Sequence, residues 1–220
     1  MKHQQNITLL NAIALMLLLF LATTSLFAQQ TKKQDEIDKK VSAFLDDRKN
    51  DWRYWNVPYE DGKVLYDLII NNNYKSGLEI GTSTGHSTIW MAWAMSKTGG
   101  KVITIEVDEG RHKTAVENIK KAGLSEFVDS RRADAHQLVK DIPGPFDFVF
   151  SDADKGWYTQ YFKDTDPKLK VGGCFTAHNI ANTTGGADEF LKYIQKLPNY
   201  TTTVNTASSS GISISYKKSE

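Results

Sequence analysis

Polar residues that could bind an anionic ligand or move a proton recur in this sequence directly after short apolar runs. A glycine-rich turn from Gly81 to Ser87 follows the apolar residues 76–80, and Glu106 ends the next apolar run. Gly81 and Gly85 let the backbone approach a ligand closely, and the N–H groups that open the following helix attract negative charge. A carboxylate at Glu106 can accept two hydrogen bonds from a ribose diol. The turn and the acid together indicate a site for a nucleoside-bearing cofactor.

Further polar clusters follow the later apolar runs, and each falls where a buried strand is expected to end. They are Asp134-Ala135, Asp152 with Lys155, and His178-Asn179. Because ligands of an open parallel sheet bind outside the carboxyl ends of its strands, all these clusters are expected to face one rim. Carboxylate, ammonium and imidazole groups on one rim could bind a metal ion or take a proton from a hydroxyl group.

Alternating strand and helix patterns predict the frame that carries these residues. Strands are expected at 76–80, 101–106, 127–131, 146–151, 173–177, 200–204 and 212–216, with helices between most of them. The run 146–151 is almost continuously apolar, as in a strand covered on both faces. The short loop 205–211 makes the last two strands antiparallel. The sequence therefore predicts an α/β fold: a doubly wound, mostly parallel, seven-stranded Rossmann-like sheet with an antiparallel strand at the C-terminal end and helices on both faces.

Length and composition fit one such domain. The chain has 220 residues and a formal net charge of +1, so no overall field would recruit nucleic acid. Its one cysteine, Cys174, lies in an apolar run and is expected to be a small buried side chain rather than part of a disulfide. A single domain is expected over residues 29–220, with leading helices within 35–72.

The first 28 residues differ from the rest of the chain. Lys2 precedes a mostly apolar run over residues 7–27, and small residues lead up to Ala28. This pattern is typical of a secretory signal peptide cleaved after Ala28, which predicts a periplasmic or secreted protein. The same run is long enough to span a bilayer uncut, so a membrane anchor formed by residues 7–27 is the alternative. The membrane is expected to matter only through that uncut segment.

From about Asn56 to its end, the chain resembles the class I S-adenosylmethionine-dependent (SAM-dependent) O-methyltransferases of the caffeoyl-coenzyme A and catechol type. The most specific match is residues 146–155, an apolar strand that ends in Asp-Ala-Asp-Lys. The turn 79–87 resembles the family's cofactor loop, and Ile105-Glu106 resembles its ribose-binding acid. The resemblance implies transfer of a methyl group from SAM to a hydroxyl of a small, catechol-like aromatic acceptor. It also raises a homodimer as an expectation.

The resemblance implies a role for each matching residue. Cofactor binding falls on Val57, Glu79, Gly81, Ser83, Gly85, Ser87, Glu106, Asp134, Ala135 and Asp152. Among these, Val57, Ser83 and Ser87 would contact the methionine part, Glu106 the ribose, and Asp134 and Ala135 the adenine. Catalysis falls on Lys155 and Asp152, and His178, which does not match the family, is a further candidate for a catalytic role. Lys155 would take the proton of the acceptor hydroxyl, which requires that its own pKa be depressed.

The chain departs from the family's pattern at His178. The family has Asp-Asn at this strand end, and both side chains bind a divalent metal together with the residue matching Asp152; here the pair is His178-Asn179. For a site of Asp152, His178 and Asn179, the imidazole favours Mn²⁺, Fe²⁺, Co²⁺ or Zn²⁺ over Mg²⁺ or Ca²⁺. This hypothesis predicts that Mg²⁺ alone supports activity poorly and that His178→Asp improves it. Two alternatives stay open: no metal binds and His178 is itself the base, or His178 only hydrogen-bonds locally.

Two rival functions use the same residues. The turn 81–85 fits G-x-S-x-G, so Ser83, Asp152 and His178 could form a hydrolase triad, although a hydrolase elbow normally follows several earlier strands and none is predicted before the strand 76–80 that leads into this turn. An exported relative could instead have become a non-catalytic protein that binds the cofactor or another ligand, because SAM is made in the cytosol. Retention of Glu106, Asp152 and Lys155 favours the enzyme.

Overall fold

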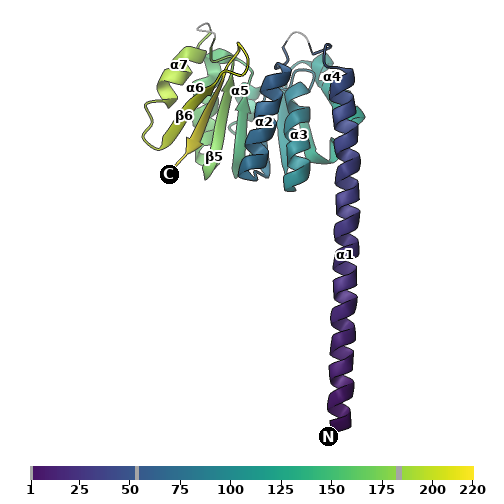
Figure 1. Ribbon diagram of the computed structural model, residues 1–220. Helices are drawn as coiled ribbons and strands as arrows, with labels where there is room; N and C mark the ends of the chain where they lie inside the picture. The colour runs from purple at the N-terminus through teal and green to yellow at the C-terminus, as the bar shows by residue number, and fades with distance from the viewer. Residues whose placement is uncertain (1, 53–54, 182–184) are drawn as a thin grey trace. The chain divides into compact units, whose positions relative to one another are not determined.

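The structure, a computed structural model, describes the backbone of residues 2–52, 55–181 and 185–220. Contacts between Cα atoms divide the chain into two units, residues 1–39 and 40–220. Helix α1 (Lys2–Asp47) contains the first unit and continues into the second (Figure 1). The sequence predicted a helix only from residue 35, but residues 28–34 contain no glycine or proline that would end one.

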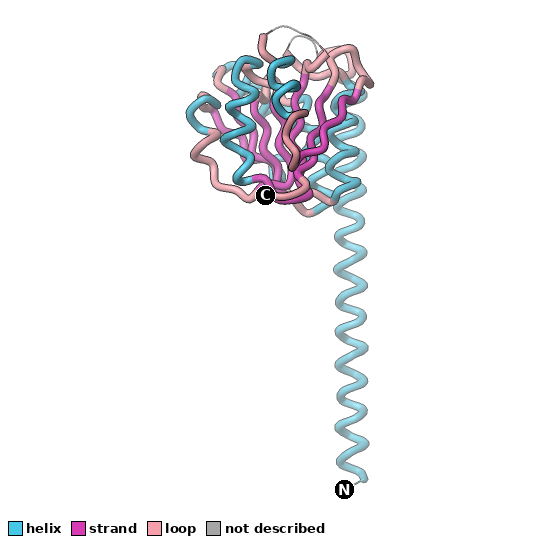
Figure 2. The backbone as a smooth tube through the Cα atoms, turned by 90° about the vertical axis from the view of Figure 1, so that its left-hand side faces the viewer, coloured by secondary structure: helices cyan, strands magenta, loops and turns pink. Residues whose placement is uncertain are grey.

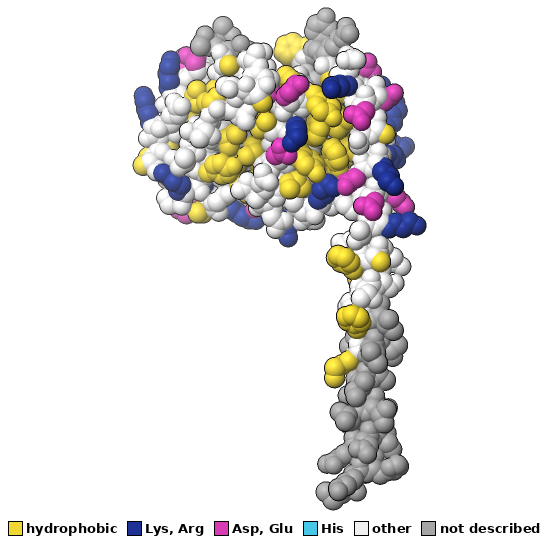
Figure 3. Space-filling model, in the orientation of Figure 1, with side chains coloured by type: hydrophobic (Ala, Val, Ile, Leu, Met, Phe, Trp, Pro, Cys, Tyr) yellow, Lys and Arg dark blue, Asp and Glu magenta, His cyan; other side chains and the backbone are white. Residues whose placement is uncertain are grey.

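The described part of the first unit carries exposed apolar side chains. Met16, Phe20, Leu26 and Phe27 are all more than 60% exposed, and Figure 3 shows yellow side chains along this helix. The predicted signal peptide or anchor includes these residues, but most of its side chains lie outside the described set. Within the residues described, no helix combines the length and the apolar character needed to cross a membrane. The cleavage of this segment therefore stays a prediction.

The second unit is built on a seven-stranded sheet with strand order β3-β2-β1-β4-β5-β7-β6. Its strands are β1 (Ser76–Ile80), β2 (Lys101–Glu106), β3 (Val128–Arg132), β4 (Phe146–Ser151), β5 (Leu169–His178), β6 (Tyr200–Asn205) and β7 (Ile212–Lys217). The pairs β1–β2, β2–β3, β1–β4 and β4–β5 are parallel, and β7 runs antiparallel to both of its neighbours. The predicted α/β class and the antiparallel strand near the C-terminus are confirmed.

Helices cover both faces of this sheet (Figures 1 and 2). They are α2 (Tyr59–Asn72), α3 (His86–Thr98), α4 (Glu109–Ala122), α5 (Ala135–Leu138), α6 (Tyr158–Thr165) and α7 (Ala187–Ile194), with short 3₁₀ turns η1 (Ser125–Phe127), η2 (Lys155–Trp157) and η3 (Asp166–Lys168). Side chains alternate along β1, so Leu78 and Ile80 join the core under α5, α6 and α7, whereas Glu79 faces α3. Strand β1 therefore presents core residues to one face of the sheet and the site residue Glu79 to the other.

Strand β5 differs from its predicted extent. It begins at Leu169 rather than Gly173, so Val171-Gly172, which precede the predicted strand, lie inside the observed one. The register with β4 shifts between the pairs Phe146–Leu169 and Phe148–Cys174, as at a β-bulge. Gly172 has a φ of 82°, which a bulge accepts as readily as a turn, so the local pattern alone did not separate the two.

Candidate active site

The ends of β1, β2 and β4 and the residues after β3 surround one cavity of about 300 Å³. This is the rim that the sequence predicted. The predicted site residues that line the cavity are Gly81, Ser83, Glu106, Asp134, Ala135, Asp152 and Lys155. The predicted site residues that do not line it are Val57, Glu79, Gly85, Ser87, His178 and Asn179. Strand direction thus brought together the groups that directly follow a strand end.

Gly81 allows the turn after β1 to lie against the end of β4. Its φ is 99°, and a Cβ at this position would come within 2.9 Å of the backbone carbonyl of Asp152. The N–H groups of Gly81 and Thr82 both donate to the carbonyl of Ile105, at 3.1 Å each. At this point of the cavity, the backbone of Gly81 packs directly against the backbone of Asp152. A side chain at position 81 therefore has no room.

We expect Gly81→Ala to lower the free energy of unfolding by about 2 kcal/mol more than Gly99→Ala does. Gly99 also has a positive φ, 75°, but a Cβ there would meet no described atom within 4 Å, so it isolates the conformational strain. The extra loss reports the clash with Asp152, which no side-chain movement can relieve. Urea unfolding of both variants measures it, and equal losses would show that the turn can move away.

Glu106 is buried at the end of β2 and fixed by several donors. Ser83 N donates to Oε2 at 2.8 Å, while Asp108 N and the guanidinium of Arg111 donate to Oε1 at 2.9 to 3.1 Å. Oε2 therefore keeps acceptor capacity on the cavity side. Arg111 was not identified from the sequence as a site residue. Its position after the N-cap Asp108 gives it a place in the first turn of α4, but nothing in the local pattern pairs it with Glu106.

Ser83 offers the cavity a free hydroxyl group. Its φ is 49°, and its buried Oγ has no hydrogen-bond partner among the described residues. A buried hydroxyl without a partner costs free energy, so a polar ligand group that bonds to it would be favoured. The unpaired hydroxyl of Ser83 could bond to a polar chain of a ligand, and the carboxylate of Glu106 could bond to a ribose. The cavity therefore fits a ligand that has both groups.

Glu79 shapes the cofactor turn from behind. Its fully buried carboxylate accepts from Ser87 Oγ and Thr104 Oγ1 at 2.5 Å each, and from the hydroxyl of Thr88. Burial raises the pKa of Glu79 to about 7, although the three hydroxyl groups oppose that rise. Because Ser87 is committed to Glu79, its predicted contact with the cofactor stays a prediction.

Val57 and Gly85 also act through packing. The carbonyl of Val57 accepts from His86 Nδ1 at 2.8 Å, and the residue is buried. Gly85 caps α3 with a φ of 96°, and a Cβ on it would touch Ala115 of α4 at 3.4 Å. Both residues therefore set the position of α3, whose N-terminus follows the turn at the cavity.

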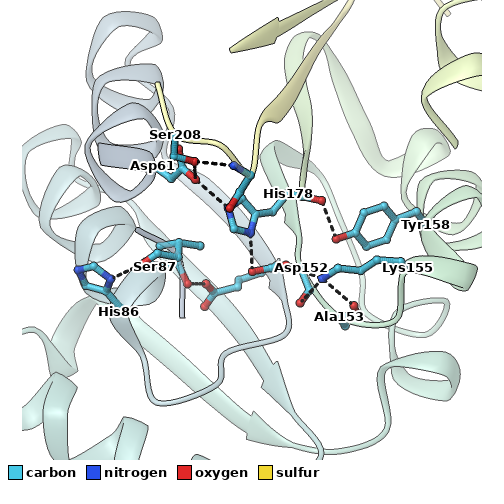
Figure 4. A network of polar contacts seen from close by, with 12 residues as sticks. Asp61, His86, Ser87, Asp152, Ala153, Lys155, Tyr158, His178 and Ser208 are labelled. Carbon is cyan, nitrogen blue, oxygen red and sulfur yellow. Dashed lines mark hydrogen bonds and ion pairs between the residues drawn. The ribbon is translucent and has the colours of Figure 1, made fainter. Parts of the chain in front are cut away.

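Four charged or ionisable groups form one connected cluster at the ends of β4 and β5 (Figure 4). Lys155 Nζ lies 2.7 Å from Asp152 Oδ1, and His178 Nδ1 lies 3.1 Å from Asp152 Oδ2. His178 Nε2 lies 2.8 Å from Oδ2 of Asp61, a fully buried residue of α2. Asp61 was missed because it is 117 positions away from His178 in the sequence.

Opposite charges within this cluster shift the pKa values of His178 and Asp152. Burial alone would lower the pKa of His178, but the carboxylates of Asp152 and Asp61 outweigh it and raise that pKa to about 9. Burial likewise opposes ionisation of Asp152, yet His178 and Lys155 hold the pKa of its carboxyl below the usual range. Lys155 Nζ also contacts the carbonyl of Ala153 at 3.2 Å. The cavity wall therefore carries a fixed carboxylate flanked by two cations.

Aromatic side chains line the far side of the cavity. His136 packs against Trp157, with the rings tilted and their centroids 4.1 Å apart, and its Nε2 lies 3.3 Å from Asp154 Oδ2. His136, Tyr161 and the exposed Trp55 line the cavity and were missed as site residues. Of the two aromatic residues after Lys155, Tyr158 is a core residue whose hydroxyl donates to the carbonyl of His178, while Trp157 is partly exposed.

The hydrolase triad, raised as a rival to the methyltransferase, is not formed by these side chains. A serine nucleophile needs a base within hydrogen-bond reach, but Ser83 Oγ has no partner among the described residues. Both ring nitrogens of His178 instead contact the carboxylates of Asp61 and Asp152. The G-x-S-x-G match arose because a cofactor turn and a nucleophile elbow both need glycines flanking a small residue.

The same contacts bear on the predicted metal ligands. Within the residues that the structure describes, no group of three or more His, Cys, Asp or Glu side chains is arranged to hold a metal ion. Asp152 and His178 touch each other, but each also bonds to another charged side chain. As these side chains lie, Asp152 and His178 do not fit a metal ion, because each is held by another charged group, and the predicted role of Asn179 as a third ligand stays a prediction.

Comparison with known proteins agrees with this geometry. Over 138 residues the chain is 39% identical to a catechol O-methyltransferase of Niastella koreensis, covering 61% of this chain and 62% of that protein. It is 30% identical over 160 residues to a caffeoyl-CoA O-methyltransferase of Medicago sativa, covering 70% and 62%. The solved O-methyltransferase from Bacillus cereus in complex with SAH superposes with a TM-score of 0.69 at 28% identity, covering 85% and 91%.

The sheet order and the rim after β1 and β2 define a Rossmann-like methyltransferase fold. Residues 31–188 match the family model described as O-methyltransferase, which is more than half of the chain. This chain belongs to that O-methyltransferase family. In its alignments with the catechol and caffeoyl-CoA O-methyltransferases above, the chain spans about 62% of the length of each relative.

Proposed function

We propose that this protein transfers a methyl group from SAM to a hydroxyl group of a small aromatic acceptor of the catechol type. The observation that carries the proposal is the shared cavity: Glu106 and the free hydroxyl of Ser83 lie on one wall, and Asp152 with Lys155 lies on another. Family membership supports the reaction type, and relatives named for catechol and caffeoyl-CoA support an aromatic acceptor.

The cavity residues fit the cofactor. Glu106 Oε2 has acceptor capacity for ribose hydroxyls, the Ser83 hydroxyl suits the methionine part, and Ala135 offers an apolar surface to a flat base. When bound, SAM supplies an electrophilic methyl group on a sulfonium. Because displacement at carbon needs three atoms nearly in line, a rigid wall such as the backbone contact at Gly81 lowers the barrier by positioning.

The acceptor hydroxyl must lose its proton to become a good nucleophile. Lys155 and Asp152 are the groups on the cavity wall that can hold that proton or stabilise the oxygen left behind. Lys155 Nζ donates to oxygen atoms of Asp152 and Ala153, so it must lose a proton and give up one of these contacts before it can act as a base; as an ammonium it can only stabilise the oxygen. Metal assistance is not part of this proposal, because the side chains as they lie do not fit a metal ion.

The rival is a non-catalytic protein that binds the cofactor alone. Titration calorimetry with S-adenosylhomocysteine (SAH), followed by incubation with labelled SAM and catechol, separates the two. We expect saturable SAH binding at one site and formation of methylated catechol. Binding without methyl transfer to catechol or to caffeoyl-CoA would favour the rival, and absence of binding would overturn both.

A further inference from the structure

The imidazole of His178 is held between two carboxylates. Nε2 lies 2.8 Å from Asp61 Oδ2 and Nδ1 lies 3.1 Å from Asp152 Oδ2. The three side chains come from α2, from the end of β4 and from the end of β5, and Figure 4 shows the ring between the two acids. His178 is 3% exposed and Asp61 is fully buried, so solvent does not compete for these contacts.

The hydrogen-bond partners of the His178 imidazole indicate which of its nitrogens carry protons. An ionised carboxylate can only accept hydrogen bonds. Asp152 also accepts from Lys155 on its other oxygen, and Asp61 Oδ2 accepts from Ser208 Oγ at 2.6 Å. With both carboxylates ionised, both ring nitrogens of His178 donate, and each nitrogen already contacts a carboxylate oxygen. A ring that donates from both nitrogens has no lone pair left for a metal ion.

Charge balance leads to the same conclusion. The carboxylates of Asp61 and Asp152 are matched by the imidazolium of His178 and the ammonium of Lys155. Buried charges are tolerated when they are paired in this way. An aspartate at position 178 would replace a cation by an anion and leave an excess of two negative charges, which a divalent ion would offset. The residue at 178 therefore decides whether the cluster needs a metal.

We propose that Asp61 and Asp152 clamp His178 as a fixed internal cation, and that methyl transfer by this chain needs no divalent metal ion. The proposal rests on the proposed function and concerns the same cavity. Asp61 is then a positioning residue: it does not line the cavity, and it acts through His178 on Asp152, which does. Ser208, on the loop between β6 and β7, completes the clamp by donating to Asp61.

The first test uses the wild-type protein. After treatment with EDTA, it is titrated with MnCl₂ while the free ion is followed by electron paramagnetic resonance, and methyl transfer from SAM to catechol is assayed with and without EDTA. We expect no saturable Mn²⁺ binding below about 1 mM and activity in EDTA within about twofold of that without it. Saturable Mn²⁺ binding together with loss of activity in EDTA would overturn the proposal, because His178 would then be a neutral ligand with Asp61 behind it.

The second test changes the ring itself. His178→Asp should bind Mn²⁺ at least about tenfold more tightly than the wild type, because a third carboxylate adds a hard ligand and negative charge. If the variant retains activity, that activity should fall in EDTA and return with Mn²⁺. Unchanged Mn²⁺ affinity in a folded variant would contradict the charge argument.

The third test addresses Asp61. Asp61→Asn should lower kcat roughly 10- to 100-fold through lost positioning, with SAH affinity unchanged within about twofold, because Asp61 does not line the cavity. Asp67→Asn is the matched control on α2, where Asp67 is exposed and pairs with Lys63. A parallel fall in kcat and SAH affinity would mean that Asp61 is merely structural. If Asp61→Asn fails to fold, the Mn²⁺ titration and the EDTA assay of the wild-type protein still test the proposal.

These outcomes separate the two proposals. A wild-type protein that methylates catechol only with a metal ion would refute the clamp and keep the proposed function. A wild-type protein that binds no SAH would refute the proposed function itself.

Discussion

Replacing Lys155 with methionine is expected to lower kcat for methyl transfer to catechol by roughly 100- to 10,000-fold, the usual contribution of a positioned acid or base. Lys155 lines the cavity, and its Nζ lies 2.7 Å from Asp152 Oδ1. Methionine keeps most of the side-chain length but can neither take a proton nor carry a charge. SAH affinity should stay within about fivefold, because the contacts of Glu106 and Ser83 are untouched.

A second substitution separates the two roles that Lys155 could have. Arginine is always charged, so Lys155→Arg keeps a cation beside Asp152 but cannot act as a base. If Lys155 takes the proton, as the family resemblance implies, the arginine variant should be as inactive as the methionine variant. Near wild-type kcat for Lys155→Arg would show instead that the cation stabilises the acceptor oxygen. Lys163→Met, an exposed lysine of α6, controls for loss of charge alone.

Replacing Glu106 with alanine is expected to weaken SAH binding about 100-fold or more, since two hydrogen bonds to a charged group are worth roughly 3 to 6 kcal/mol when both are lost. The buried carboxylate is fixed by Ser83 N, Asp108 N and Arg111, so it is already oriented before a ligand arrives. A preorganised acceptor loses little entropy on binding, which adds to its contribution. Calorimetry with SAH measures the loss.

The matched control for Glu106 is Glu109→Ala. Glu109 begins α4 close to Glu106 but is exposed and pairs with Lys113 and Arg132 at the surface. Surface ion pairs of this kind contribute little, so SAH affinity should be unchanged. Equal affinities for wild type and a folded Glu106→Ala variant would show that the cofactor does not reach this carboxylate. Thermal melts of both variants without SAH exclude a folding defect as the cause.

The frame was predictable because its signals are local. Apolar runs and flanking glycines predicted β1, β2 and β4 at the bounds observed, and the short loop after β6 predicted the antiparallel strand. The carboxyl ends of parallel strands share one edge, so the cavity groups Gly81, Glu106 and Asp152 could be placed together from sequence. The bulge in β5 could not, because Gly172 fits a turn and a bulge equally well.

The candidate site was only partly predictable, because side-chain pairs depend on how elements pack. Nothing near Glu106 in the sequence names Arg111 as its partner, and Ser87 gave no sign that its hydroxyl would bond to Glu79. The hydrolase triad failed for the same reason: the order of Ser83, Asp152 and His178 along the chain says nothing about which atoms meet.

What the sequence alone determined is the chemistry of the rim, because residue type and strand ends specify which groups face one edge of a parallel sheet. What the tertiary structure decided is which side chains surround His178. The sequence left it as a metal ligand, a base or a local hydrogen-bonding residue, and packing α2 against the ends of β4 and β5 places Asp61 on its second nitrogen. Two acids 91 positions apart enclose one ring, and a contact of that range exists only after the chain has folded.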